Sequence, residues 1–583
     1  MINGRLIPNS TRTDVVTHTI KINGEAISRR FQVMSILVMR ELNRIPYCRI
    51  NMIDGNAATQ DFPVSAEDLF VPGNEIEALL GYYAEESTVF KGIITGHSIK
   101  VRRGGAQLTV DCKDAAVKMA IAARSRYFLD VKDSDIMEEL ASGYGLDADI
   151  EATDVTHAEL VQYELTDWDL FISRAQANGR VCLVNDGLIS VLKPSLDSEP
   201  VLEAAYGSSS LEEFDAEIDA RYQYSSVLAK SWDYAGQEVL EAEAADPGFE
   251  EAGNLSAAQL ADVVGLDPPL TLYHGGQVVQ EELQAWADAQ LILSRLARLR
   301  GRVKFQGYAA ILPGETIQLS GVGPRMSGKV YVSGIRHEYA GGNWYTDAQF
   351  GLDADFFTRT HKVNAPRAGG LLGAVSGLQA GVVTQLEEDP DGENRIRVKL
   401  PIVNPDDDGV WARVATLDAG ENRGTFFLPE VGDEVIVGFI NDDPRDPVVL
   451  GMLNSSAKPA PFTASNDNHE KGLVTRSEMK CVFNDDLKSI SLETPAGNTI
   501  LLSEDEGGIS LADENGNKIV LNSDGITLES AKDIILKASG DIKAEGVNIE
   551  SKASAQFKAE GQAGLEVSSS AVAVLKGSLV QIN

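Results

Sequence analysis

Cysteine and long apolar runs are both scarce in this sequence. Its four cysteines, Cys48, Cys112, Cys182 and Cys481, are spread over 583 residues. None therefore has the spacing of a zinc site, and four are too few for a disulfide framework. The longest apolar run near the N-terminus, FQVMSILVM at 31–39, is far shorter than a membrane-spanning helix. Because the opening residues MINGRLIPNSTRTD form no apolar signal core, we expect synthesis in the cytoplasm without a signal peptide.

Basic residues are outnumbered by acidic ones, 51 to 87, which gives a formal charge of −36. Such a chain lacks the basic surface with which proteins bind nucleic acid, so we expect no nucleic-acid partner. The acidic excess favours solubility and repels other acidic surfaces. With 43% apolar residues the chain can still bury ordinary cores.

The common catalytic motifs are also missing: the sequence has no GxSxG elbow, no Walker loop and no HExxH helix. Its seven histidines are scattered, and His97 and His337 lie in predicted strands, as structural histidines often do. Two turns that begin at Asp389 and Asp513 resemble calcium loops, but they lack the glutamate at the twelfth position. We predict that both are hairpin turns, and we expect no catalytic site, no metal and no cofactor.

What the sequence does contain is a repeat at its C-terminal end. From Asp533 onward it falls into units such as DIILKASG and QFKAEGQA, and GNTILLS at 497–503 returns as GNKIVLN at 516–522. Alternating apolar and polar residues predict strands with one buried face, and the small residues between them predict tight corners. A near-constant period of short strands predicts a β-helix. Its leading apolar residues recur every seven or eight positions: Ile534, Ile542, Ile549, Phe557, Leu565 and Val572.

A single chain of such strands would leave its edges unpaired. Winding several identical chains around one axis would pair the edges and bury the thin apolar stripe. We therefore predict an intertwined needle with those six residues as its core. Two alternatives stay open: a single-chain solenoid, and a low-complexity tail, which the acidic, Gly- and Ser-rich composition would also suit.

Upstream, the sequence predicts a β-rich region that also contains helices. Strands are expected at 15–22, 31–39, 47–53, 89–97 and 108–114. The segment 166–180 predicts a helix with Thr166 and Asp169 as a capping box and Gly179 at its C-terminal end. A second helix is expected over 281–301, ended by Gly301. Residues 200–270 are rich in Ala, Glu and Asp and permit no assignment.

Beyond residue 363 the sequence predicts a compact all-β unit. Short strands at 381–388, 394–401, 410–417, 425–429, 434–440 and 447–453 suit a small closed barrel of the OB type. The predicted domains are a β-rich region with helices at 1–365, the barrel at 366–455, a Pro/Ser/Asn linker at 456–473 and the needle at 474–583.

The barrel segment GVWARVATLDAGENRGTFFLPEVGDEVIVGFINDDPRDPVVLGML resembles the VgrG spike proteins of bacterial contractile injection systems. These proteins in turn resemble a fusion of the hub and spike proteins of phage tails. The segments ELNRIP, VFKGIITGH, TDWDLFISRAQANG and SGIRHEY resemble parts of the family's hub region. The resemblance implies a mainly β fold with an α+β N-terminal region: phage-hub-like domains at 1–365, an OB-fold barrel and an intertwined trimeric β-helix.

The resemblance also implies a function. A homotrimer would adapt a sixfold injection tube to a threefold needle and puncture the target envelope. Its partners would be tube and baseplate proteins at the hub, and effectors, and it would be delivered extracellularly or into the target cell. Two other functions stay open: a phage-type spike with cell-wall hydrolase activity, which the short linker at 456–473 disfavours, and a β-helical adhesin.

Strand alternation continues through the last residues, and no charged residue follows Lys576. Three copies would end in a platform with open strand edges and exposed apolar side chains. The resemblance implies that a conical PAAR-repeat protein docks there, at Val580, Gln581, Ile582 and Asn583. The alternative is that these ends fray in solvent.

Overall fold

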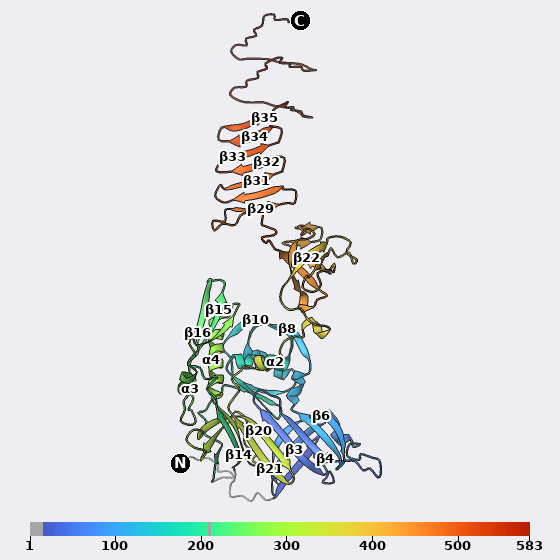
Figure 1. The fold of residues 1–583 in the computed structure, drawn as a ribbon, viewed down its shortest axis with the longest axis vertical. Coiled ribbons are helices and arrows are strands. Elements are labelled where there is room, and N and C mark those ends of the chain that lie inside the picture. Colours follow the sequence, from blue (N-terminus) through green and yellow to red (C-terminus); the bar gives the residue numbers. More distant parts are fainter. Residues whose placement is uncertain (1–14, 208–210, 583) are drawn as a thin grey trace. The chain divides into compact units, whose positions relative to one another are not determined.

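The computed structural model describes residues 15–207 and 211–582 (Figure 1). The chain forms two compact units. The first unit runs to Val375 and takes in Asn441–Asp443, and the second runs from Ser376 onward. Among the described residues, no helix is both long and apolar enough to cross a bilayer.

The first unit is built on a sheet of thirteen strands, eleven of which follow the order β14-β18-β21-β20-β3-β4-β7-β6-β5-β1-β2. The other two, β13 and β19, pair with each other, and β19 also pairs with β20. The strands are β1 (Val16–Ile22), β2 (Glu25–Ala26), β3 (Val33–Glu41), β4 (Tyr47–Ile53), β5 (Glu75–Tyr82), β6 (Glu85–Arg102), β7 (Gly105–Lys113), β13 (Leu202–Ala205), β14 (Leu211–Ile218), β18 (Leu299–Gln306), β19 (Thr316–Ser320), β20 (Gly328–Ala340) and β21 (Asn343–Phe350).

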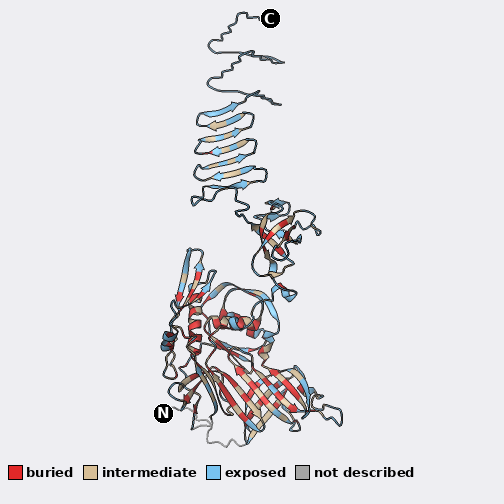
Figure 2. Ribbon diagram, in the orientation of Figure 1, coloured by how far each residue is buried: buried red, intermediate tan, exposed pale blue. Residues whose placement is uncertain are grey.

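Alternation along these strands gives the sheet one buried and one less buried face, as Figure 2 shows by its pattern of buried and half-buried residues. Ile36 and Val38 in β3 and Ile50 in β4 are fully buried in one cluster. Val303 and Phe305 in β18 belong to a second. Three of the four cysteines are buried as free thiols.

Among the described residues, the rest of the first unit consists of small sheets, five α-helices and short 3₁₀ turns. The strands are β8 (Ala123–Lys132), β9 (Asp147–Ile150), β10 (Thr156–Thr166), β11 (Val181–Asn185), β12 (Leu188–Leu192), β15 (Val227–Asp233), β16 (Glu238–Glu243) and β17 (Leu270–His274). The helices are α1 (Asp133–Ser142), α2 (Asp167–Ala177), α3 (Ala257–Val264), α4 (Gln280–Leu296) and α5 (Phe357–Thr360), with 3₁₀ turns η1 (Asp68–Phe70), η2 (Ala115–Ala120), η3 (Arg367–Gly370) and, where the chain passes between the units, η4 (Ile440–Asp442).

Helix α2 confirms the predicted N-cap at Thr166, without the return bond of a capping box, and α4 corrects the second predicted helix. The hydroxyl of Thr166 accepts a hydrogen bond from the Asp169 amide, as an N-cap does. Helix α4 ends at Leu296, so the expected helix over 281–301 is wrong at its C-terminal end, and Gly301 lies inside β18. Residues 299–306 instead pair with β14 and β21. A Cβ at position 301 would lie 2.2 Å from the Asp215 carbonyl oxygen, so this close pairing requires glycine there.

A buried ion-pair network joins α1, α2, β10 and α4. Asp133, which is only 1% exposed, accepts hydrogen bonds from Arg174 at 2.6 Å and Asn178 at 2.8 Å, and its carboxylate lies 3.0 Å from His157. Arg174 also donates to Glu282 at 2.7 Å. Burial alone would raise the pKa of Asp133, but these partners hold that pKa well below its usual range.

The segment 200–270, unassigned from the sequence, contains β13–β16, α3 and the start of β17. Strands β16, β15 and β17 form a three-stranded sheet. One face of this sheet packs its buried residues Val227, Ala229 and Leu272 against Leu283 and Ala287 of α4. Local sequence patterns did not predict this sheet, because β15 pairs in parallel with β17, more than 40 residues away.

The second unit begins with a closed barrel of five strands in the order β22-β23-β24-β28-β27, which confirms the predicted OB-like barrel. The strands are β22 (Gln379–Gln385), β23 (Ile396–Lys399), β24 (Val410–Val414), β27 (Glu434–Phe439) and β28 (Pro447–Met452), with a small hairpin of β25 (Ala419–Gly420) and β26 (Arg423–Gly424). The strand expected at 425–429 does not form. Its Phe426 and Phe427 are exposed, so they add nothing to the barrel core.

Seven antiparallel strands follow in sequence order, and we call this sheet the meander. They are β29 (Glu470–Val474), β30 (Lys480–Asn484), β31 (Ser489–Glu493), β32 (Thr499–Ser503), β33 (Gly508–Ala512), β34 (Lys518–Asn522) and β35 (Gly525–Glu529). The repeated GNTILLS and GNKIVLN segments supply β32 and β34. From residue 530 to 582 the single chain forms no strand or helix.

Candidate assembly surfaces

One face of the meander carries two columns of apolar side chains that the single chain leaves uncovered. Strand pairing aligns the first column as Phe483, Ile490, Leu502, Ile509, Leu521 and Ile526. It aligns the second as Cys481, Leu492, Ile500, Leu511, Ile519 and Leu528. Apart from Cys481 and Leu521, these side chains are 37–71% exposed. An apolar surface of this regularity marks an interface rather than a solvated face.

The opposite face of the meander is more polar. Its central column alternates half-buried Val482, Leu501 and Val520 with Ser491 and Ser510. At the edge of this face, Lys480 Nζ lies 3.6 Å from a Glu493 carboxylate oxygen. The two faces thus differ in hydrophobicity, and only the first is suited to be buried in an assembly.

A groove of about 1120 Å³ runs beside the second column. Leu492, Ile500 and Leu511 line it from the meander, and Ile534 and Leu536 line it from the chain that follows β35. The predicted needle residue Ile534 therefore lies next to the apolar column, although it remains 54% exposed.

The other predicted needle residues are also exposed in the single chain. They are Ile542, Ile549, Phe557, Leu565 and Val572. Of the predicted docking residues, Val580, Gln581 and Ile582 are exposed, and Asn583 lies outside the described residues. The needle core and the docking site therefore stay predictions.

Sequence reasoning missed the two columns of the meander. The signal was present, since each of five successive strands has apolar residues two positions apart, as in SISLE, TILLS, GISLA, KIVLN and GITLE. The repeat of seven or eight residues farther along is more regular, so the predicted apolar core was placed at 534–572. Hydrophobic pairs at strand spacing would have identified the columns.

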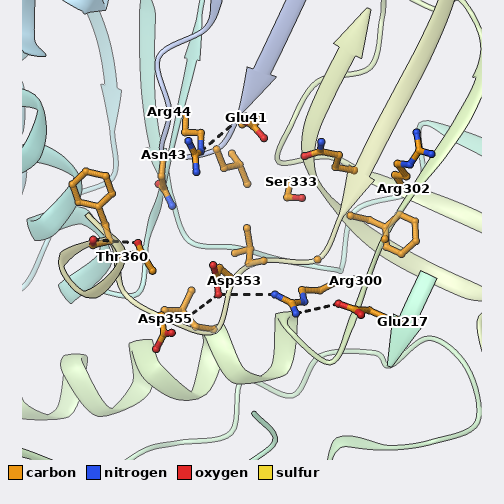
Figure 3. A pocket seen from close by; sticks show the side chains of 18 of the residues that line it. Glu41, Asn43, Arg44, Glu217, Arg300, Arg302, Ser333, Asp353, Asp355 and Thr360 are labelled. Atoms are coloured by element: carbon orange, nitrogen blue, oxygen red, sulfur yellow. Dashed lines mark hydrogen bonds and ion pairs between the residues drawn. The ribbon is translucent and has the colours of Figure 1, made fainter. Parts of the chain in front are cut away.

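The first unit has a charged recess of about 750 Å³ between α4, α5 and the large sheet (Figure 3). Arg300 lies 3.1 Å from Glu217 and 4.0 Å from Asp353, and Arg44 lies 3.5 Å from Glu41. These opposite charges neutralise one another, as in a structural ion-pair cluster.

The remaining sequence candidates take structural roles. His337 is buried and its Nδ1 lies 3.0 Å from the Thr346 hydroxyl, and His97 Nδ1 lies 2.9 Å from the Phe70 carbonyl oxygen. Asp389 binds the side chain of Arg395 between β22 and β23, and Asp513 accepts amide hydrogen bonds between β33 and β34. Both Asp-rich segments are thus turns between paired strands, as predicted. Within residues 15–207 and 211–582, no cluster of His, Cys, Asp and Glu has the makings of a metal site.

The family profile described as the Alg8 N-terminal domain matches residues 12–341, more than half of the chain. The chain belongs to this family. In this Alg8-family chain, residues 379–453 match the type VI secretion system/phage-baseplate injector OB domain, and residues 489–583 match the phage baseplate V C-terminal trimerisation domain. These two matches confirm the recognition of a VgrG-type spike protein. They cover the barrel and most of the meander together with the segment after it.

Two curated relatives that match this chain are named as VgrG spike proteins of type VI secretion systems. The Alg8-family chain is 26% identical over 145 residues to the type VI secretion system spike protein VgrG3 of Vibrio cholerae, covering 24% of this chain and 14% of that protein. It is 26% identical over 230 residues to VgrG1b of Pseudomonas aeruginosa, covering 36% of this chain and 30% of that protein. The chain thus matches less than a third of either relative's length.

Among solved structures, a tail protein from Neisseria meningitidis is 15% identical, with a TM-score of 0.45 over 59% of this chain and 98% of that chain.

Proposed function

We propose that this Alg8-family chain forms a homotrimeric spike at the front of a contractile injection tube. The apolar face of the meander supports the trimer most directly. Each side chain of its two columns would gain roughly 1 kcal/mol or more when buried, and three such faces around one axis cover one another. The match of residues 489–583 to a trimerisation domain supports the same assembly.

The segment after Glu529 continues the spike in this proposal. Its backbone makes no strand within one chain, so its amides and carbonyls need partners from other copies. Pairing among three copies would bury Ile534, Ile542, Ile549, Phe557, Leu565 and Val572 on the axis and produce the intertwined needle. Hydrogen bonds between copies would then spread an axial load when the spike is driven into an envelope.

The first unit serves as the hub in this proposal, with tube and baseplate proteins as its partners and with effectors as cargo. It would adapt the sixfold tube to the threefold needle. The role is mechanical rather than catalytic, and it requires delivery outside the producing cell. A PAAR-repeat protein would dock on the tip at Val580, Gln581, Ile582 and Asn583.

Light scattering on the pure chain tests the trimer. We expect about 188 kDa, three times the 62.7 kDa of one chain. Leu502→Asp would place three carboxylates on the buried axis at several kcal/mol per ion, and it should convert the trimer to monomer. Leu501→Asp is the matched control, because Leu501 points to the opposite face of the same strand. A wild-type monomer, or equal effects of the two substitutions, would contradict the proposal.

A further inference from the structure

Two apolar patches on the first unit are exposed among the residues that the structure describes. The first lies on the two-stranded ribbon of β8 and β10, whose inner face packs Phe128 into a core cluster. Its outer face presents Tyr127 opposite Val161, with Leu129 two residues farther along β8, and Tyr163 follows two residues after Val161 in β10. These four side chains are 55–77% exposed. A two-stranded ribbon is marginally stable alone, so a cover on this face would also stabilise the ribbon.

The second patch lies on the outward face of the β15–β17 sheet, opposite α4. Trp232 pairs with Val239 across β15 and β16, and Tyr273 lies beside Lys230 across β17 and β15. Tyr273 is 75% exposed and Val239 52%. Figure 1 shows the β15–β16 end and β8 on opposite sides of α2 and α4 within this unit.

Threefold symmetry requires such a pair of different patches. In a closed ring of three copies each contact is heterologous, so one surface of a copy meets another surface of its neighbour. A needle that holds three first units together would also give their contacts a high effective concentration. Two unlike apolar patches on opposite sides of one unit are suited to this arrangement.

The two patches differ in charge in a chain whose overall charge is −36. On the outward face of the β15–β17 sheet Glu241 and Glu243 accompany one lysine, Lys230, which pairs with Glu241, and Asp233 and Glu238 add two carboxylates at the end of the sheet. The ribbon segments 121–132 and 156–166 hold three basic and three acidic residues. The ribbon is therefore a part of the surface that the acidic sheet can approach without net repulsion.

We infer that the outer face of the β8–β10 ribbon of one copy packs against the outward face of the β15–β17 sheet of the next copy. This contact rests on the proposed trimer and defines its ring. It buries Tyr127 and Leu129 against Trp232 and Tyr273, and it closes after three copies.

Cross-linking the full-length protein tests the contact. Tyr127→Cys and Tyr273→Cys are combined in a Cys481→Ser background, and a bis-maleimide with a short spacer is added. We expect denaturing gels to show species of two and three linked chains, whereas either single-cysteine variant stays a monomer on the gel. A trimer by light scattering that gives no ladder would overturn the contact and leave the proposed function standing. Ladders from a single variant would also overturn it, and a monomeric protein would overturn both.

Hydrogen exchange gives a second readout that does not depend on reagent geometry. Leu129→Asp should leave the trimer mass unchanged but speed amide exchange in β15–β17, an element outside the ribbon, by about tenfold. Val101→Asp is the matched control, because Val101 is also about 60% exposed but lies in β6. Unchanged exchange in β15–β17 with Leu129→Asp, or an equal change with Val101→Asp, would refute the contact.

Discussion

The large sheet of the first unit and the meander of the second unit use similar strands but differ in where their apolar side chains go. Ile36 and Ile50 in the large sheet are fully buried, whereas Ile500 and Leu502 in the meander are 39% and 41% exposed. The first unit thus completes its cores within one chain. The meander pairs its strands within one chain but leaves its apolar columns exposed. The segment from residue 530 to 582 forms no strand and buries no apolar core. Substitutions should therefore act on the fold of a copy in one region and on assembly in the other.

The largest expected effect is in the needle. Phe557→Asp would bury three carboxylates together on the proposed axis, which costs several kcal/mol per ion. We expect the trimer to be lost or its needle to unfold, while the first unit keeps its own thermal transition. Gln556→Asp, with the adjacent side chain on the other face, is the control. A Phe557→Asp protein with wild-type trimer mass and midpoint would show that this register is misassigned.

The next effect falls on the other side of the comparison, in the first unit. Asp133→Ala would leave the largely buried Arg174, whose side chain is 18% exposed, without its main carboxylate partner, and losing one partner of a buried pair costs about 3–5 kcal/mol. Calorimetry should show a lower midpoint for the first unit with an unchanged trimer mass. Glu138→Ala, at an exposed position of the same helix, should change neither. Loss of the trimer by Asp133→Ala would erase the distinction between the two regions.

A smaller effect concerns pH. Burial lowers the pKa of His337 to about 3, so the folded protein keeps this imidazole neutral while the unfolded chain takes up a proton below pH 6.5. Stability from this group is therefore full above pH 6.5 and falls as the pH drops, by about 2 kcal/mol at pH 5. Chemical unfolding at pH 7.5 and pH 5 should show this loss in the first unit, and His337→Gln should reduce it. An equal loss in both proteins would exclude His337 as the source.

The smallest effect on stability is expected at the tip. Residues 580–582 are exposed and form no strand or helix, so deleting Val580–Asn583 should leave the trimer mass and the thermal midpoints unchanged. Binding of the cognate PAAR-repeat protein should be lost, as measured by calorimetric titration. Undiminished binding would place the docking surface elsewhere on the spike.

Local patterns predicted local structure well. Alternation located the barrel strands and β32 and β34, and Thr166 and Asp169 marked the start of α2. Pairing between distant segments was beyond a local pattern. Strand β3 pairs with β20, about 300 residues later. Residues 299–301, which the sequence predicted as the end of a helix, instead begin β18, because β14 and β21 pair with it.

The candidate surfaces divide in the same way. The exposed columns of the meander could have been predicted, because apolar residues two positions apart recur in successive strands of the sequence. The two patches on the first unit were not predictable, because Tyr127 and Val161, or Trp232 and Val239, become neighbours only through strand pairing. Exposure is a property of the folded unit, so the same alternation gives a buried stripe in β3 and an uncovered one in β8.

The unpaired backbone from residue 530 to 582 also bears on the lifetime of a newly made copy. Proteases bind extended chain, and a segment with no strand or helix of its own offers them about fifty residues until partners arrive. A copy that assembles would lose this vulnerability, and one that stays alone would keep it. The same segment that stiffens a finished spike would thus mark surplus copies for degradation, so that the supply of spikes is set by complete sets of three.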